Sequence, residues 1–127
     1  MAEREIVFID THVVVWLYEG RKVFSTRAIE LMNQCDLRIS PIVRLELQML
    51  HQINRIDHPF IILSLLKRDF YFDEEKVDFS QLITQSLNVN FTRDPFDRFL
   101  VGHAQLLDRK LITKDRDILK NFEGAVW

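Results

Sequence analysis

The fold class follows from the stretch Glu5-Ile6-Val7-Phe8-Ile9-Asp10 near the start of the sequence. Its four central residues are consecutive, apolar and mostly β-branched, which is typical of a strand buried on both faces. A helical pattern follows at once over residues 12–18, with Thr11 as its expected N-cap. A buried strand that leads directly into a helix predicts a parallel sheet covered by helices.

The same alternation of strands and helices continues along the chain. Further strands are expected over residues 36–40, 70–72, 110–113 and 125–127. Further helices are expected to begin near Ser25, Ser40-Pro41, Pro59, Asp78, Asp94-Pro95 and Asp115. In the helix from Pro41, the stripe expected to face the core is Ile42, Leu45, Met49 and Ile53. No linker or repeat interrupts the pattern, so we expect a single α/β domain over residues 1–127. Its expected architecture is a three-layer sandwich with a central, mostly parallel sheet of four to five strands flanked by helices.

Composition excludes several classes of protein. Hydrophobic residues make up 47% and charged residues 28%, which is typical of a globular domain, and the net charge of −2 argues against a strongly basic nucleic-acid clamp. The single cysteine, Cys35, excludes a disulfide framework and a cysteine-built zinc site. Three glycines cannot form a dinucleotide or P-loop motif. Apolar runs are too short to span a membrane and the charged N-terminus lacks a signal peptide, so we expect a cytoplasmic protein.

Acidic residues fall where the expected strands end. Asp10 directly follows the first strand, and Asp115 follows the strand over residues 110–113. Asp94 and Asp97 open the helix that precedes that strand. Ligands of parallel sheets bind at the carboxyl ends of the strands, so these acids are candidates for one shared site.

A further acid, Glu46, lies inside the helix from Pro41 with apolar neighbours at Ile42 and Met49. An ionised carboxylate beside a buried face is costly unless it is paired or binds a metal. Carboxylates without cysteines or paired histidines form an oxygen-ligand site, which suits Mg²⁺ or Mn²⁺. Such a site fits phosphodiester hydrolysis, in which the metal activates water and neutralises the phosphate.

Four stretches together carry a resemblance to a known family. They are residues 8–17 (FIDTHVVVWL), 39–46 (ISPIVRLE), 93–100 (RDPFDRFL) and 111–117 (LITKDRD). In these stretches, and in their order and spacing, the chain resembles PIN-domain ribonucleases, and most closely VapC-type toxins of bacterial toxin–antitoxin pairs. The likeness covers nearly the whole chain, and it implies the PIN-like form of the expected sandwich. One departure is Gly102-His103, where small residues, often alanine, are usual in the family.

The resemblance implies a role for each acid. The residues that match the catalytic, metal-binding carboxylates of the family are Asp10, Glu46, Asp97 and Asp115. The candidates for orienting these acids or a bound water are Thr11, Asp94, Thr113 and Asp117, with Asp94 also expected to cap its helix. The candidates for RNA phosphate contacts, because they flank the acids, are Arg44, Arg93, Arg98, Lys114 and Arg116.

The resemblance also implies an activity and partners. The expected activity is a Mg²⁺- or Mn²⁺-dependent endoribonuclease that acts as the toxin of a VapBC-type pair. The expected partners are an RNA substrate, a VapB-like antitoxin whose tail covers the site, and a second copy of the chain in a homodimer; no membrane partner is expected.

Simpler roles stay open at this point. Asp10 and Asp97 also suit helix capping, Glu46 also suits an arginine partner, and the basic residues also suit ion pairing with the acids. The main functional alternative is a non-catalytic PIN-like module that binds RNA or protein. A phosphotransfer enzyme with Asp10 as nucleophile ranks last, because His12 stands where a second acid is needed.

Overall fold

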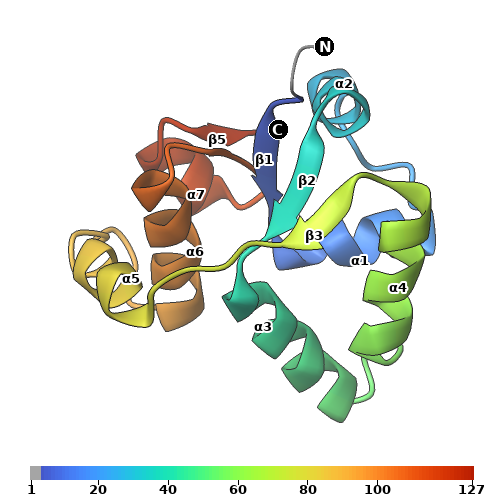
Figure 1. The fold of residues 1–127 in the computed structure, drawn as a ribbon, viewed down its shortest axis with the longest axis horizontal. Helices are drawn as coiled ribbons and strands as arrows, with labels where there is room; N and C mark the ends of the chain where they lie inside the picture. The colour runs from blue at the N-terminus through green and yellow to red at the C-terminus, as the bar shows by residue number, and fades with distance from the viewer. Residues whose placement is uncertain (1–3) are drawn as a thin grey trace.

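The computed structural model describes residues 4–127 and shows alternating strands and helices (Figure 1). The elements are β1 (Ile6–Ile9), α1 (Thr11–Glu19), α2 (Thr26–Gln34), β2 (Asp36–Ile39), α3 (Pro41–Gln52), α4 (Pro59–Asp69), β3 (Phe72–Glu74), α5 (Phe79–Ser86), α6 (Pro95–Leu106), β4 (Lys110–Ile112), α7 (Arg116–Asn121) and β5 (Ala125–Val126). Residues 1–3, part of the N-terminus in which we expect no signal peptide, lie outside the described residues.

The strands form one five-stranded sheet in the order β3-β2-β1-β4-β5, and all four pairings are parallel. β1 lies at the centre, where Val7 is in register with Leu37 of β2 on one side and with Lys110 of β4 on the other. This confirms the expected α/β sandwich with a parallel sheet. The connection from β1 to β2 and the later return to β4 leave β1 in opposite directions, so a topological switch point lies at the carboxyl ends of β1 and β4.

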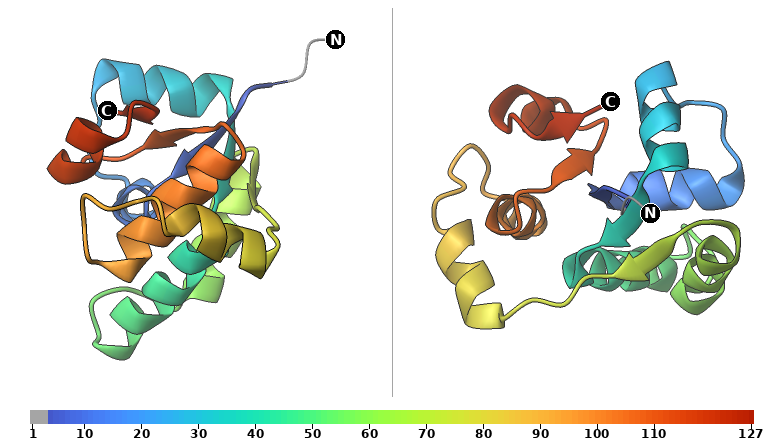
Figure 2. Two further views of the ribbon diagram at one scale, coloured as in Figure 1. Left: turned by 90° about the vertical axis from the view of Figure 1, so that its left-hand side faces the viewer. Right: turned by 45° about the horizontal axis from the view of Figure 1, so that its top comes forward.

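Helices cover both faces of the sheet (Figure 2). α1 and α2 lie on one side of β1, and α5 and α6, which pack against each other, lie on the other. The core between these layers includes Val7, Phe8 and Ile9, whose side chains are fully buried. The continuous apolar run of β1 is therefore explained by burial on both faces, as expected. No helix within residues 4–127 is both long and apolar enough to cross a lipid bilayer.

The caps of the helices follow the sequence signals with one correction. α1 begins one residue earlier than expected, so Asp10 rather than Thr11 is its N-cap, and the Asp10 carboxylate accepts a hydrogen bond from the Thr11 backbone N–H. Ser40 occupies the N-cap position of α3, but its hydroxyl makes no capping bond. It lies instead 2.8 Å from Nδ1 of the fully buried His103 of α6. This contact ties the start of α3 to α6.

The buried face of α3 differs from the expected one. Val43 and Leu47 are buried, whereas Leu45, Met49 and Ile53 are 52%, 45% and 59% exposed. Both sets have helical spacing, because seven of the thirteen residues from Pro41 to Ile53 are large and apolar. Periodicity alone therefore cannot decide which stripe packs inward, and α3 presents an apolar stripe to solvent.

A close contact between α5 and α6 explains the glycine that departs from the family pattern. A Cβ added at Gly102 would lie 2.6 Å from Ser86 Oγ and 3.2 Å from Ser86 Cα. We expect Gly102→Ala to lower the free energy of unfolding by about 1–2 kcal/mol, because overpacking outweighs the better helix propensity of alanine. Urea denaturation measures this change, and Ser86→Ala in the same chain should recover part of it. An alanine variant as stable as the parent would contradict the close contact.

Candidate active site

A cleft of about 510 Å³ opens at the carboxyl ends of β1 and β4. The four carboxylates expected to act together, Asp10, Glu46, Asp97 and Asp115, all line this cleft, and Asp94 lines it as well. They come from four separate segments of the chain, and the parallel topology brings them to one rim. A larger groove of about 790 Å³ between α3, α4 and β3 contains none of these five acids.

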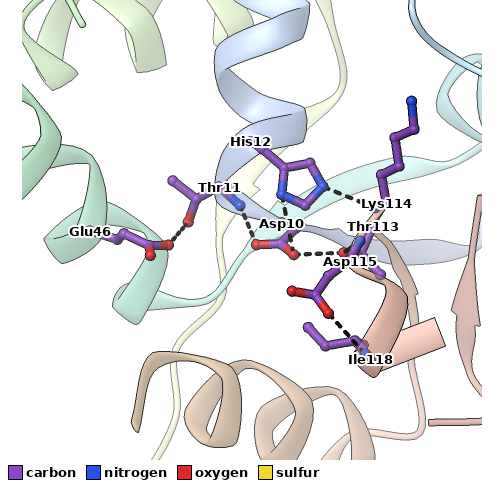
Figure 3. Close-up of polar contacts among 8 residues, drawn as sticks. All are labelled: Asp10, Thr11, His12, Glu46, Thr113, Lys114, Asp115 and Ile118. Carbon is purple, nitrogen blue, oxygen red and sulfur yellow. Dashed lines mark hydrogen bonds and ion pairs between the residues drawn. The ribbon is translucent and has the colours of Figure 1, made fainter. Parts of the chain in front are cut away.

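Asp10 lies at the centre of the polar contacts in the cleft (Figure 3). Its Oδ1 accepts a hydrogen bond from the backbone N–H of Thr11 at 2.7 Å, and its Oδ2 accepts one from the hydroxyl of Thr113 at 2.7 Å. Asp10 is only 6% exposed and Thr113 is fully buried. The carboxylate is therefore both an N-cap of α1 and a rigidly oriented acceptor at the end of β1.

Glu46 reaches the cleft from α3 through a contact with Thr11. The Thr11 hydroxyl donates a hydrogen bond to Glu46 Oε1, so one residue next to Asp10 orients the second acid (Figure 3). Burial raises the pKa of Glu46 above its usual range; the Thr11 hydrogen bond counteracts this rise, and the charges of Asp10 and Asp94 add to it. Within residues 4–127, no arginine forms an ion pair with Glu46. The partner that places Glu46 is a hydroxyl.

Asp97 is the most strongly perturbed acid of the cleft. It lies in the first turn of α6, and burial raises its pKa to about 7. The charges of Asp94, Asp115, Asp10 and Glu46 add to this rise, in decreasing order. The four other carboxylates are therefore close enough to repel the ionised form of Asp97. A cleft with this charge repels an anionic ligand unless a cation balances it.

Asp94 and Asp115 combine a place in the cleft with helix capping. Asp94 accepts a hydrogen bond from the backbone N–H of Phe96 at 2.9 Å, and Asp115 accepts one from that of Ile118 at 3.0 Å. The backbone N–H of Asp115 also donates to the Thr113 hydroxyl at 3.1 Å. Thr113 thus connects Asp10 to Asp115 and holds the ends of β1 and β4 together.

The structure places several other predicted site residues away from the cleft. Asp117 is exposed and does not line it. Arg44 forms a two-pronged contact with Glu74, with distances of 2.6 and 3.2 Å, and lines the larger groove instead. Arg98 donates a hydrogen bond to the carbonyl of Thr92 at 2.8 Å, which fixes the loop before α6.

The remaining basic candidates stay at the surface. Arg93 and Arg116 are exposed next to Asp94 and Asp115 in the sequence. Lys114 is exposed too, with its ammonium 6.0 Å from the ring centroid of Trp16 and 5.6 Å from that of Trp127.

Several cleft residues were not predicted from the sequence as part of the site, among them His12, Trp16, Glu19, Arg21 and Arg55. Nε2 of His12 accepts a hydrogen bond from the Lys114 backbone N–H at 2.9 Å, and this bond places the ring proton on Nδ1, 3.5 Å from Asp10 Oδ2. Arg21 and Arg55 line the cleft from segments without a recognisable motif. Only the proximity of His12 to Asp10 in the sequence could have indicated any of these.

The donors of the cleft fit a hard divalent cation. All the acids that line it offer carboxylate oxygens, which Mg²⁺ and Mn²⁺ prefer. Burial raises the pKa values of Glu46 and Asp97, repulsion from the other acids adds to the rise, and positive charge in the cleft would offset both by favouring the ionised carboxylates. Among residues 4–127, no three acidic, histidine or cysteine side chains already stand close enough to chelate an ion. The acids thus surround the cleft without forming a closed ligand cage.

We compared the sequence of the chain with models of known protein families. The PIN domain family matches residues 7–124. The chain belongs to the PIN domain family. PIN domains are in general nucleases, and a hydrolase activity of this chain is consistent with that. The resemblance found in the sequence is therefore confirmed at the level of the family.

Solved structures share the fold of this PIN domain over nearly its whole length. A toxin–antitoxin complex from Klebsiella pneumoniae matches with a TM-score of 0.67 at 20% identity, covering 95% of this chain and 96% of that chain. A DNA-bound VapBC complex from Rickettsia felis matches with a TM-score of 0.63 at 16% identity, covering 95% and 96%. A VapBC complex from Haemophilus influenzae matches with a TM-score of 0.62 at 18% identity, covering 94% and 91%. At these identities the likeness shows the fold. Comparison with curated protein sequences gave no match.

The Thr11–Glu46 contact in the PIN domain predicts a measurable titration shift. Thr11→Val removes a hydrogen bond that favours the ionised form of Glu46, so the pKa of Glu46 should rise further. NMR titration of the side-chain carboxyl carbons measures this pKa. Thr11→Ser keeps the hydroxyl and should leave the pKa near the parent value. An unchanged pKa in the valine variant would show that Thr11 does not orient Glu46.

Proposed function

We propose that this PIN domain is a Mg²⁺- or Mn²⁺-dependent endoribonuclease and the toxin of a VapBC-type toxin–antitoxin pair. The observation that carries the proposal is the convergence of Asp10, Glu46, Asp97 and Asp115 on one cleft at the switch point of the sheet. Burial and, after it, the charges of the other acids raise the pKa of Asp97, and this energetic cost is hard to explain by a structural role.

The proposed roles follow from the contacts of each residue. Asp10, Glu46, Asp97 and Asp115 would hold the divalent cation, which supplies water activation and charge neutralisation at the phosphate. Thr113 holds the Asp10 carboxylate in one orientation, and Thr11 does the same for Glu46. The His12 ring fixes the backbone of Lys114, so that the residues after β4 keep their place beside Asp10.

Cationic side chains at the rim would contact the RNA backbone. Arg55 lines the cleft, while Arg93, Lys114 and Arg116 are exposed near it in the sequence. Arg21 also lines the cleft, but its guanidinium pairs with Glu19 at 2.9 Å. Phosphate contacts of this kind position a nucleic acid without reading its sequence. Arg44 and Arg98 are not assigned this role, because their guanidinium groups already bond Glu74 and the Thr92 carbonyl.

The proposed partners are an antitoxin protein and a second copy of the chain, and the proposed location is the cytoplasm. The structural neighbours support the antitoxin, because their structures are of toxin–antitoxin and VapBC complexes. Exposed apolar residues supply surfaces for protein contacts: on α3 these are Leu45 and Met49, and on α4 they are Phe60 and Ile61.

The test is incubation of the purified chain, freed of any bound partner, with total cellular RNA. Parallel reactions contain Mg²⁺, Mn²⁺, EDTA, or Mg²⁺ with the Asp10→Asn variant. Discrete fragments in the two wild-type reactions with metal, and in no others, are the expected result; sequencing of their ends then identifies the cleaved site. A folded, metal-binding protein that produces no fragments would favour the non-catalytic binding module instead.

A further inference from the structure

A cluster of aromatic rings lies at one edge of the cleft and is not used by the proposed chemistry. Trp16 of α1 and Trp127 after β5 have ring centroids 6.0 Å apart at an interplanar angle of 70°. Phe24 packs 5.6 Å from Trp127, and His12 packs 4.8 Å from Trp16. The cluster joins residues from the two ends of the described chain.

The indole rings of this cluster are only partly buried. Trp16 and His12 both line the cleft that holds the acids, so the aromatic surface continues directly into the candidate active site. Trp127 and Phe24 also pack against the core, which fixes the cluster in place. The indole surface left exposed beside the cleft suits a ligand that is itself flat.

Lys114 lies between the aromatic cluster and the carboxylates of the cleft, because it precedes Asp115 and its ammonium is close to both indole rings. Its backbone N–H is held by His12, whereas its exposed ammonium lies 6.0 Å from the Trp16 ring centroid and 5.6 Å from that of Trp127. Cation–π contacts at exposed sites are weak, about 0.5–1 kcal/mol, so this ammonium can leave the rings at little cost. A phosphate group nearby would attract it more strongly than the rings do.

We propose that Trp16 and Trp127 form a stacking platform for an unpaired nucleobase of the RNA, next to the phosphate held at the carboxylates: the base stacks on the Trp16 ring and meets the Trp127 ring, tilted by 70°, with its edge. Lys114 leaves the ring faces when the base stacks and contacts an RNA phosphate. Stacking on an aromatic ring accepts any base, because every base has a π face. The platform therefore selects single-stranded RNA over a duplex. This inference rests on the proposed function, because it assumes that the cleft binds RNA.

Intrinsic fluorescence tests the platform directly, because Trp16 and Trp127 are the only tryptophans in the chain. The protein carries Asp97→Asn to prevent turnover and is titrated in Mg²⁺ with a single-stranded decaadenylate. A decamer of abasic ribose with the same number of phosphates is the matched ligand. We expect strong quenching and tight binding with the decaadenylate, and weaker binding with little quenching for the abasic decamer.

Substitutions then separate stacking from packing. Trp16→Leu and Trp127→Leu should each weaken decaadenylate binding by roughly tenfold, since one stacked base contributes about 1–3 kcal/mol. Neither should change binding of the abasic decamer. Trp16→Phe keeps a ring and should retain most of the affinity even if Trp16→Leu folds poorly. Phe60→Leu is the control, because Phe60 is 73% exposed on α4 and does not line the cleft.

The outcomes distinguish this inference from the proposed function. Equal quenching by both decamers, or unchanged affinity in folded leucine variants, would overturn the platform even if the wild-type chain cleaves RNA. A wild-type chain that fails to cleave any RNA, but still shows base-dependent quenching lost in Trp16→Leu, would overturn the nuclease proposal and support the platform.

Discussion

Asp10→Asn should reduce RNA cleavage by at least 100- to 1,000-fold while leaving the fold intact, the size of loss expected when one charge-stabilising group leaves an active site. Asparagine has the same shape and is an equally good N-cap, so α1 should still begin at the same residue. Its amide oxygen can accept the Thr11 N–H, and its NH₂ group can face the Thr113 hydroxyl. What the variant loses is the negative charge at the centre of the cleft.

The measurement is the initial rate of cleavage of the RNA identified from total cellular RNA, with folding checked by circular dichroism. Asp117→Asn is the matched control, because it makes the same chemical change at an exposed acid outside the cleft. We expect its rate to stay near the wild-type value. Wild-type activity in Asp10→Asn would remove Asp10 from the reaction and with it the basis of the proposed site.

Asp97→Asn should stabilise the protein at pH 8 in the absence of divalent metal. The pKa of Asp97 is about 7 in the folded chain, against 3.8 for the free side chain. Below about pH 4 the group is neutral in both the folded and the unfolded state, so it has no effect on stability. Between about pH 4 and pH 7 the unfolded state releases this proton while the folded state keeps it, so the wild-type free energy of unfolding falls across this range. Above pH 7 both states are ionised and the loss is complete; the asparagine variant avoids it.

We expect the gain at pH 8 to be about 2 kcal/mol after allowance for the partial exposure of Asp97, or a rise in Tm of roughly 5–10 °C. Thermal unfolding in EDTA at pH 8 and at pH 4 measures the difference, which should vanish at the lower pH. Added Mg²⁺ should raise the Tm of the wild type at pH 8 more than that of Asp97→Asn, because the cation removes the same repulsion. A gain in Tm that is independent of pH would contradict the electrostatic cause.

The order of elements could be predicted from the sequence, because β1 is a short apolar run, β2 alternates polar and apolar residues, and most helices carry a recognisable cap or proline. The inward face of α3 could not. Val43 and Leu47 compete with Leu45 and Met49 for the core, and only the positions of the neighbouring elements decide between them. The exact start of α1 was missed for a related reason, since Asp10 and Thr11 are both good N-caps.

That Asp10, Glu46, Asp97 and Asp115 share one cleft could be predicted, because the carboxyl ends of parallel strands and the family motifs indicate these residues. The supporting contacts could not be predicted in this way. The bond between His12 and Lys114 joins residues 102 positions apart, and no pattern in either segment indicates it. Arg44 was predicted at the site because it is close to Glu46 in the sequence, but it lies on another face of α3 and pairs with Glu74.

The central pairing of β1 with β4 determines when, during synthesis on the ribosome, the cleft can form. Synthesis runs at about 5–20 residues per second, so Asp10 emerges several seconds before Thr113 and Asp115 exist. Until then β1 lacks one of its two neighbours, and the hydroxyl that holds Asp10 is missing. A nascent or truncated chain that ends before β4 therefore contains Asp10, Glu46 and Asp97 but lacks the strand and the Thr113 hydroxyl that hold Asp10 in place. A reaction that needs all four acids could therefore begin only after synthesis has passed β4 and Asp115.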